Sequence, residues 1–452
     1  MNIKKPSRLL QKVISLLCFI IPISLIATSC SEKDNNTSDS KPVFNSEAIF
    51  PFQSDHVHAS TIVELPNGDL LTGWFQGSGE RWADVVKIMG ARKKNGKREW
   101  SPPFVLADIR EFPDCNPVLF LDGKDRLWLM WIKIIANQWE TSLVKYRISK
   151  DYLNMSGSPN WTWQDDLHIK PGDKAERGIQ PEDSFVGSVK KQLNDYAEYT
   201  KSLPDQDFIA DSWNRCIEST LFKARGENMI RDGRLYSEDG QYVSAPLGYP
   251  YFRRMGWQTR NKPFITTSGR MIVPLYSDGF GFSLMAFTDN WGESWRFSDP
   301  LVGNGNIQPA ITQTKSGELM TYMRDNGSPP KRLHISRSED SGKTWSAVRD
   351  SELPNPGSAA DIVTLKNGNW ILIYNDTEKG RNSLAAALSE DEGKTWPWHK
   401  AIVSEGQTIK AHYPAMIVGE EGLLYVSYSY FLNENQKTIM HAAFNEAWVK
   451  SE

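Results

Sequence analysis

Ser338-Glu-Asp-Ser-Gly-Lys-Thr-Trp345 and Ser389-Glu-Asp-Glu-Gly-Lys-Thr-Trp396 are two copies of one motif, Ser-x-Asp-x-Gly-x-x-Trp. A weaker copy, Thr288-Asp-Asn-Trp-Gly-Glu-Ser-Trp295, precedes them, and the copies are 50 and 51 residues apart. A fixed period of this size is typical of a repeat architecture. In each copy, short polar side chains can hydrogen-bond the backbone two residues further on, and the glycine can adopt positive φ. With a tryptophan to anchor the turn under a sheet, the motif predicts a structural turn and not a catalytic site.

A second repeat consists of six glycines, each followed by an apolar, strand-like segment: Gly68, Gly123, Gly269, Gly317, Gly368 and Gly422. The intervals between them are 55, 146, 48, 51 and 54 residues. About fifty residues accommodate four short strands with their turns. The repeats therefore predict an all-β fold, a six-bladed β-propeller, with one long insertion between the second and third blades.

The long interval predicts a partly helical insertion at about residues 163–255. Apolar residues recur at helical spacing between Phe185 and Tyr196, and again between Ile209 and Leu221. One interpretation is two amphipathic helices that pack on the propeller or cover its mouth. The other is a degenerate seventh blade, because Gly233-Arg-Leu-Tyr236 is similar to the glycine–strand segments of the other blades.

The N-terminus is typical of an export signal, with basic residues up to Lys12 followed by the apolar stretch Val13–Ala27. Ala27-Thr-Ser-Cys30 resembles the cleavage site of bacterial lipoproteins, with Cys30 as the lipidated residue. We therefore expect a lipoprotein signal peptide at 1–30, a flexible tether at 31–45 and the propeller at 46–450. A lipid anchor would hold the protein to a membrane at the cell surface or in the periplasm, whereas a plain secretory signal is the alternative.

The formal net charge of −3 becomes −7 when the four cations of the signal are removed. No basic stripe or nucleic-acid motif stands out, so we expect no nucleic-acid partner. No paired CxxC, HExxH or phosphate-loop motif is present, and we predict neither a cofactor nor a metal site. A structural Ca²⁺ bound by scattered oxygen ligands would leave little trace in a sequence.

Polar residues near the start of each blade are the candidates for a site, because a propeller brings its inner strands to one central axis. The catalytic candidates are His58, Glu80, Asp84 and Tyr413. The candidates for substrate binding are Arg81, Asn116, Arg260, Lys262, Gln308, Arg324, Asp361 and Arg381. Arginine and lysine bind carboxylates, and a histidine or a carboxyl group with a raised pKa transfers protons. This combination indicates a site for an acidic sugar.

The motif, with phrases such as NPVLF and IQPAI, resembles the sialidase-like (BNR-repeat, Asp-box) superfamily over residues 50–162 and 256–445, in a bacterial branch labelled exo-α-sialidase. Sialidases clamp the substrate carboxylate with three arginines. The resemblance implies that Arg324 and Arg381 are the second and third of these. It also implies that Asp84 or Glu80 is the acid/base carboxyl group and that Tyr413 is the nucleophile. The first arginine belongs in an Arg-Ile-Pro phrase, where this chain has His56-Val-His-Ala59.

Three functions follow, each with an acidic oligosaccharide or polysaccharide as partner. The first is an exo-acting glycoside hydrolase of polysaccharide degradation. The second is a lyase or dehydratase that neutralises the carboxylate of a uronic acid and removes the α-proton with a histidine or tyrosine. His58 in place of an arginine suits this second chemistry. The third is a non-catalytic, glycan-binding surface lipoprotein.

Overall fold

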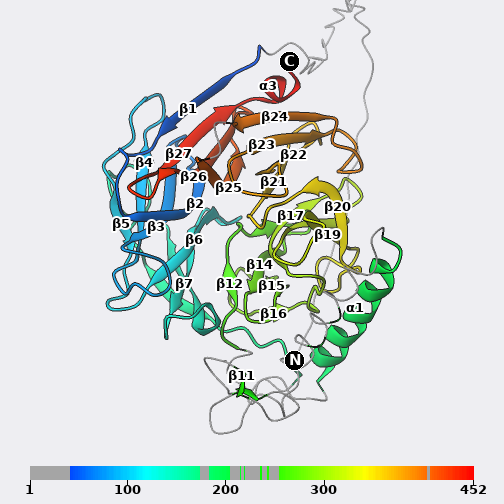
Figure 1. Cartoon of the computed structure of the whole chain (residues 1–452). Helices are drawn as coiled ribbons and strands as arrows, with labels where there is room; N and C mark the ends of the chain where they lie inside the picture. Colours follow the sequence, from blue (N-terminus) through cyan, green and yellow to red (C-terminus); the bar gives the residue numbers. More distant parts are fainter. Residues whose placement is uncertain are drawn as a thin grey trace, which may run out of the picture. The chain divides into compact units, whose positions relative to one another are not determined.

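The propeller is a ring of small antiparallel sheets, and in all but the last of them the innermost strand comes first in the sequence (Figure 1). The computed structural model describes residues 41–173, 183–203, 254–404 and 408–451, together with a few positions between 204 and 253. In these residues six sheets form the blades, which confirms the predicted six-bladed propeller. Tryptophans such as Trp74, Trp131 and Trp370 are fully buried in the core.

The first three blades contain the inner strands β2, β6 and β12. From inside to outside, the first blade comprises β2 (His56–Glu64), β3 (Leu70–Gly77), β4 (Lys87–Lys93) and β5 (Phe104–Ala107). The second comprises β6 (Asp114–Leu121), β7 (Leu127–Ile134), β8 (Ser142–Ser149) and β9 (Trp163–Leu167). The third comprises β12 (Gln258–Thr259), β14 (Met271–Ser277), β15 (Phe282–Thr288) and β16 (Arg296–Phe297). A short β13 (Phe264–Ile265) also pairs with β14, so the inner strand of the third blade is interrupted.

The last three blades contain the inner strands β17, β21 and β25. The fourth blade comprises β17 (Asn306–Gln313), β18 (Leu319–Asp325), β19 (Arg332–Ser338) and β20 (Arg349–Pro354). The fifth comprises β21 (Asp361–Thr364), β22 (Trp370–Asn375), β23 (Leu384–Ser389) and β24 (Trp398–Val403). The sixth comprises β25 (Lys410–Val418), β26 (Leu424–Asn433), β27 (Gln436–Phe444) and β1 (Phe44–Ala48). A short helix, α3 (Glu446–Lys450), follows β27. All six predicted glycine–strand segments are second strands of blades.

The ring is closed by the first strand of the chain, which completes the last blade. β1 pairs antiparallel with β27, from Phe44 opposite Phe444 to Ala48 opposite Met440, and the two strands lie side by side in Figure 1. Strand β1 therefore begins at Phe44, inside the segment 31–45 that we expected to be a tether. Pairing the two ends of the chain in one sheet stabilises the ring against opening between its first and last blades.

The Ser-x-Asp-x-Gly-x-x-Trp motifs are turns between the third and fourth strands of their blades. Asp340 accepts hydrogen bonds from the backbone N–H groups of Lys343 (3.0 Å) and Thr344 (2.9 Å), three and four residues further on instead of two. Gly342 has φ +84°, and an added Cβ there would lie 2.9 Å from Ile272. Trp345 is buried, as predicted for the anchor of the turn. The motif is structural, and its side chains lie away from the propeller axis.

The insertion begins later than predicted and adds no seventh blade in the described residues. β9 is the outer strand of the second blade, so the insertion starts after Leu167 and not at residue 163. β10 (Leu235–Tyr236) and β11 (Tyr242–Val243) form only a two-stranded sheet. The first predicted helix is α1 (Ser184–Thr200), whereas the second, at 209–221, lies almost wholly outside the described residues.

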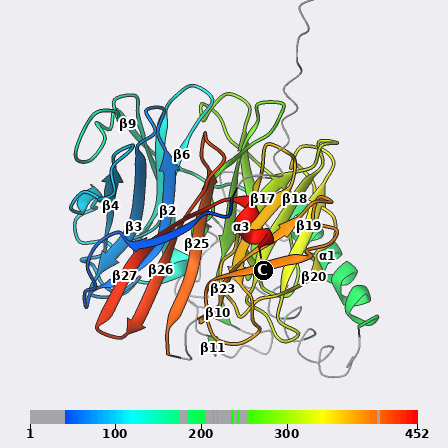
Figure 2. The ribbon, with the colours of Figure 1, turned by 90° about the horizontal axis from the view of Figure 1, so that it is seen from above.

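Helix α1 packs on the side of the propeller, next to β20 (Figures 1 and 2). Its apolar face is buried, as the spacing of Phe185, Val189 and Tyr196 predicted. Gln192 fixes it to the third blade by donating to the carbonyl of Pro300 and accepting from the N–H of Val302 (2.9 Å). This helix therefore buttresses the propeller and does not cover its mouth.

The predicted signal peptide, its Cys30 and the tether up to residue 40 lie outside the described residues. Among the residues that are described, no helix is long and apolar enough to span a membrane. Within the same part of the chain, no group of three or more histidine, cysteine, aspartate or glutamate side chains is arranged to hold a metal ion.

Asp340→Ala should destabilise the protein by about 1–2 kcal/mol, because two backbone N–H groups of the turn lose their acceptor, as at a deleted helix cap. Glu339→Ala is the matched control, since Glu339 is exposed in the same turn. Urea unfolding followed by tryptophan fluorescence measures both. Equal midpoints for the two variants would contradict a structural role for the motif.

Candidate functional site

Four inner strands carry a β-bulge at the same place, and three of these bulges direct a side chain into the central cavity. The register shifts lie between His58 and Thr61 in β2 and at the matching positions of β6, β17 and β25. The residues in the bulges have left-handed backbone: Ala59 (φ 51°), Asn116 (φ 51°), Gln308 (φ 55°) and Tyr413 (φ 55°). Such backbone in a non-glycine residue costs about 1–3 kcal/mol and concentrates at functional sites.

These bulges open into a central cavity of about 260 Å³. Three bulge residues line it, and each of them precedes a proline: Asn116, Gln308 and Tyr413. The other lining residues come from the first, second, third, fourth and fifth blades and the loops that follow their strands: His58, Phe75, Glu80, Trp139, Tyr276, Asp278, Arg324 and Arg381. The cavity is therefore polar, with two arginines, two carboxyl groups and several aromatic side chains.

Tyr413 is a phenol surrounded by cationic and hydrogen-bond-donating groups. Its phenol oxygen accepts hydrogen bonds from Arg324 Nη1 (2.6 Å) and Gln308 Nε2 (3.1 Å). The guanidinium carbon of Arg381 lies 5.3 Å from the ring centroid. Burial alone would raise the pKa of Tyr413, but Arg324, Arg381 and the hydrogen bond from Gln308 together lower it below the ordinary value of tyrosine. This phenol is prepared to act as a nucleophile or as a base.

Whereas the surroundings of Tyr413 favour its charged form, those of Asp278 favour the neutral form of its carboxyl group. Burial raises the pKa of Asp278, although nearby Arg324 and a hydrogen bond from Gln258 Nε2 (2.7 Å) oppose the shift. Tyr276 donates to Gln258 (3.1 Å) and accepts from Gln308 (3.2 Å), so a continuous chain of hydrogen bonds joins Asp278 to Tyr413. A raised carboxyl pKa beside a lowered phenol pKa is the pattern of an acid and a base within one site.

A neutral histidine stacks on the polarised tyrosine. The rings of His58 and Tyr413 have centroids 4.2 Å apart, and His412 lies 4.8 Å from His58. Burial, with the neighbouring His412 and His56, holds the pKa of His58 well below its ordinary value. His58 Nδ1 shares a hydrogen bond with Ser429 Oγ (3.0 Å), and His56 pairs with Glu80 (3.2 Å).

The interruption in the third blade sends three polar side chains across the propeller axis. Arg260 donates to the carbonyls of Ser60 and Pro414, in the first and last blades, and its guanidinium lies 5.1 Å from the ring centroid of Tyr413. Asn261 donates to the carbonyl of Ala360 (2.6 Å), and Lys262 pairs with Asp361 (2.5 Å). These residues fasten opposite blades together beside the cavity, and Arg260 adds positive charge to the surroundings of Tyr413.

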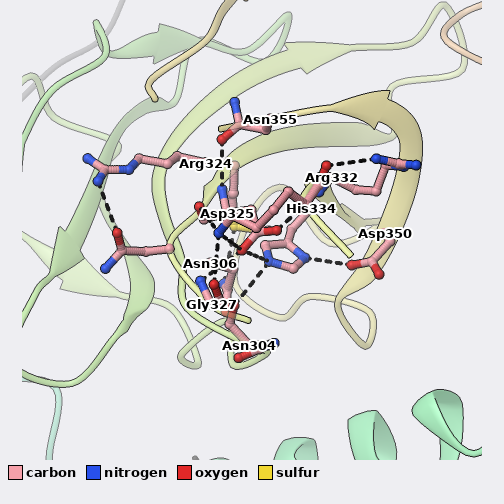
Figure 3. Close-up of polar contacts among 12 residues, drawn as sticks. Asn304, Asn306, Arg324, Asp325, Gly327, Arg332, His334, Asp350 and Asn355 are labelled. Atoms are coloured by element: carbon pink, nitrogen blue, oxygen red, sulfur yellow. Dashed lines mark hydrogen bonds and ion pairs between the residues drawn. The ribbon is translucent and has the colours of Figure 1, made fainter. Parts of the chain in front are cut away.

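Asp325, the residue after Arg324, belongs to a buried cluster of charged side chains (Figure 3). Asp325 accepts from the N–H groups of Gly327 (2.8 Å) and Arg332 (3.0 Å). His334 lies between two carboxylates, 3.6 Å from Asp325 and 2.9 Å from Asp350. Burial alone would lower the pKa of His334, but both carboxylates raise it to about 10, so the ring is a cation at neutral pH.

The structure brings most, but not all, of the predicted site residues together. Seven line the cavity: His58, Glu80, Asn116, Gln308, Arg324, Arg381 and Tyr413. Arg260, Lys262 and Asp361 lie beside it in the contacts across the axis. Asp84 lies outside the lining, exposed and bonded to Asn137 (3.1 Å), so its catalytic role stays a prediction. Arg81 stacks on Trp82 and Trp139 and also lies outside the lining.

Sequence reasoning missed Phe75, Trp139, Tyr276 and Asp278. Phe75 and Tyr276 lie near the ends of second strands, at the place where Arg324 stands in the fourth blade, and Asp278 directly follows the second strand of the third blade. A search of the last residues of each second strand would have found Phe75 and Tyr276. Trp139 lies in the short 3₁₀ helix η2 (Trp139–Thr141), for which the blade repeat offers no signal.

A family model described as a BNR repeat-like domain matches residues 68–181 and 231–426, more than half of the chain. The chain therefore belongs to the BNR repeat-like family. Among curated proteins it is similar to a protein named sialidase from Bacteroides fragilis, with 29% identity over 210 residues. That match covers 42% of this chain and only 38% of the relative, so the chain spans well under half of that protein's length.

Two solved structures share the fold. A Dyadobacter fermentans protein of unknown function is 13% identical and has a TM-score of 0.61, over 90% of this chain and 98% of that one. The intramolecular trans-sialidase of Ruminococcus gnavus is 12% identical and has a TM-score of 0.56, over 89% and 98%. At these identities the similarity concerns the fold alone, and it agrees with a sialidase-like propeller.

His334→Gln should destabilise the protein most at low pH. The pKa of His334 is about 10 in the folded protein and about 6.5 in the unfolded chain, so the folded state holds the proton more tightly. Its stabilising contribution is complete below pH 6.5 and is lost as the pH rises toward 10. The gap in unfolding free energy between wild type and variant should therefore shrink over this interval.

Urea unfolding at pH 6, 8 and 9.5 measures that gap. His168→Gln is the control, because burial lowers the pKa of His168 and its contribution should not change above pH 6.5. A gap for His334→Gln that stays constant from pH 6 to 9.5 would show that the imidazole is not charged in the folded protein.

Proposed function

We propose that this member of the BNR repeat-like family is an exo-acting glycoside hydrolase on acidic sugars. The observation that carries the proposal is the contact of the Tyr413 phenol with Arg324 and Gln308, which helps to lower its pKa. Glycosidases that use a tyrosine nucleophile are a recognised exception to the usual pair of carboxylates. Similarity to proteins named sialidases supports the same class of reaction.

The roles follow from the charges of the cavity. Arg324 and Arg381 would bind the carboxylate of the sugar, since guanidinium groups suit planar anions. Tyr413 would attack the anomeric carbon, and its negative charge before attack is stabilised by the same arginines. Asp278, whose burial raises its pKa, would donate a proton to the leaving oxygen. Glu80, which also lines the cavity, is the second candidate for this acid.

The size of the cavity supports an exo mode of action. Its volume of about 260 Å³ lies below the ~300–1,000 Å³ of sites for drug-sized ligands. A terminal sugar ring fits such a space, whereas an internal stretch of a polysaccharide needs an open groove. The side walls of Phe75 and Trp139 would pack on the apolar face of that ring.

A second candidate is a lyase or dehydratase acting on a uronic acid. Neutral His58 stacked on Tyr413 favours it, because the tyrosine and the histidine would together supply a base and a proton shuttle beside the bound carboxylate. The absence of an arginine in His56-Val-His-Ala59, where the first of the three carboxylate-binding arginines belongs in sialidases, points the same way. In this case Tyr413 would remove the α-proton instead of attacking carbon.

One assay separates these reactions. The protein is incubated with sialosides and with uronate oligosaccharides, and the products are followed by mass and ultraviolet absorbance. Release of a free sugar acid with the addition of water supports the hydrolase. Loss of water, or cleavage that leaves an unsaturated uronate, supports the lyase or dehydratase. Binding without any product would favour a glycan-binding protein and would overturn both enzymatic proposals.

Tyr413→Phe should lower kcat on the active substrate by at least about 100-fold, because general acid–base or nucleophilic groups contribute about 10²–10⁴-fold. Tyr374→Phe is the control, since Tyr374 is a buried tyrosine of the fifth blade that bonds His399 and does not line the cavity. Steady-state kinetics measure both variants. Retention of more than a tenth of the activity by Tyr413→Phe would exclude Tyr413 as the reacting group.

His58→Ala discriminates between the two reactions. Under the lyase proposal it should abolish turnover with the fold intact, since the proton shuttle is lost. Under the hydrolase proposal it should lower kcat by about 10-fold or less, because the arginines still polarise Tyr413.

Export, and lipid attachment at Cys30, stay predictions of the sequence.

A further inference from the structure

A second, larger cleft lies at the opposite end of the first blade from the central cavity. Its volume is about 680 Å³. His58, near the start of β2, lines the cavity, whereas Gly68, in the turn that follows the end of β2, lines the cleft. The cleft is bounded by the turn between β4 and β5, by the closing strand β1, and by β26 and β27. Nothing in the proposed reaction makes use of it.

The cationic wall of the cleft is a turn that replaces the Ser-x-Asp-x-Gly-x-x-Trp motif in the first blade. It runs Lys93-Lys-Asn-Gly-Lys-Arg98, and Lys93 and Lys97 occupy the places of Ser338 and Gly342 in the fourth blade, because Lys93 pairs with Leu70 as Ser338 pairs with Leu319. Asn95, which has no carboxylate, stands where the motif has Asp340. The missing carboxylate comes from a neighbouring turn, because Asp69 accepts from the N–H of Asn95 (2.9 Å) and pairs with Lys94 (2.9 Å).

Two of the four cations are neutralised inside the protein and two are not. Glu47 of β1 binds Lys93 (2.5 Å) and the indole N–H of Trp100 (2.9 Å). Burial would raise the pKa of Glu47, but bonds to His441, Lys93 and Trp100 lower it to about 2, so this carboxylate stays charged and occupied. Among the described residues, no carboxylate pairs with Lys97 or Arg98, and both side chains are exposed.

The facing wall offers neutral polar and aromatic groups. Asn45 and Ser46 come from β1, and Tyr425 from β26 stacks on His441 with ring centroids 5.8 Å apart. Amides and hydroxyls suit sugar hydroxyl groups, an aromatic ring suits the apolar face of a sugar, and unpaired cations suit carboxylates. The cationic wall of the cleft contrasts with the chain as a whole, which carries a net negative charge.

We propose that this cleft is a second binding site, for a carboxylate-bearing oligosaccharide, remote from the central cavity. Lys97 and Arg98 bind the acidic groups, and Tyr425 with Asn45 contacts the rings between them. The cleft is more than twice as large as the cavity, so it accommodates a segment of two or more rings where the cavity accommodates one. It holds a polymeric substrate to the protein without taking part in bond cleavage.

The test uses tetragalacturonate as the probe and isothermal titration calorimetry at low salt. Lys97→Glu with Arg98→Glu should weaken binding at least 10-fold. The matched control is Lys343→Glu with Lys394→Glu, which reverses two exposed lysines at the equivalent turn positions of the fourth and fifth blades. This control and Tyr413→Phe should bind as the wild type does, which separates the cleft from the cavity. Salt should weaken the wild-type binding, because exposed charges are screened.

Three results would overturn the proposal. The first is no binding of tetragalacturonate to the wild type, or equal binding by the cleft variant. The second is equal binding of maltotetraose, which is neutral and would show that the cations are irrelevant. The third is cleft-dependent binding to phosphatidylglycerol vesicles but not to the oligosaccharide, which would assign the cations to a membrane surface. Turnover of a small substrate stays unchanged in the cleft variant, so failure here leaves the proposed reaction untouched.

Discussion

The site depends on the bulges in the inner strands. Side chains in a regular strand alternate between the two faces of the sheet, which in a propeller are covered by the neighbouring blades. The left-handed residue in each bulge breaks this alternation and turns Asn116, Gln308 and Tyr413 toward the axis. Each such residue costs about 1–3 kcal/mol, which the surrounding sheet must offset. Without the bulges these three side chains would not meet.

The second constraint is the excess of positive charge around one phenol. Arg260, Arg324 and Arg381 all lie within 6 Å of the ring of Tyr413, measured from the guanidinium carbon to the centroid. A buried cation is costly unless it is paired, and the backbone carbonyls bound by Arg260 and Arg381 offset only part of that cost. The remaining charge is available to an anionic ligand or to a phenolate, which is why one arrangement serves both substrate binding and activation of Tyr413.

The sequence predicted the elements whose signals are local. The glycine before each second strand and the turn motif are read from a few adjacent residues, so the blades and their order could be counted. The closing strand β1 could not be found, because its pairing with β27 joins residues almost 400 positions apart. The polar strand β9 was assigned to the insertion, since its residues are mostly exposed and lack the apolar alternation of a strand. Asp278 was missed because its pKa shift comes from burial among residues of other blades, and no local pattern records that.

The same closure that completes the ring explains why the first blade can do without its turn motif. In the fourth blade the carboxylate that holds the turn is part of the turn, and Asp340 binds the backbone of the residues after it. In the first blade β1 lies alongside, and Glu47 with Asp69 supplies carboxylates from outside the turn. The turn itself can therefore contain lysines and an arginine, because Glu47 and Asp69 reduce the repulsion between these cations. The cationic cleft lies at the seam of the ring, where β1, paired with β27 from the other end of the chain, reaches the turn.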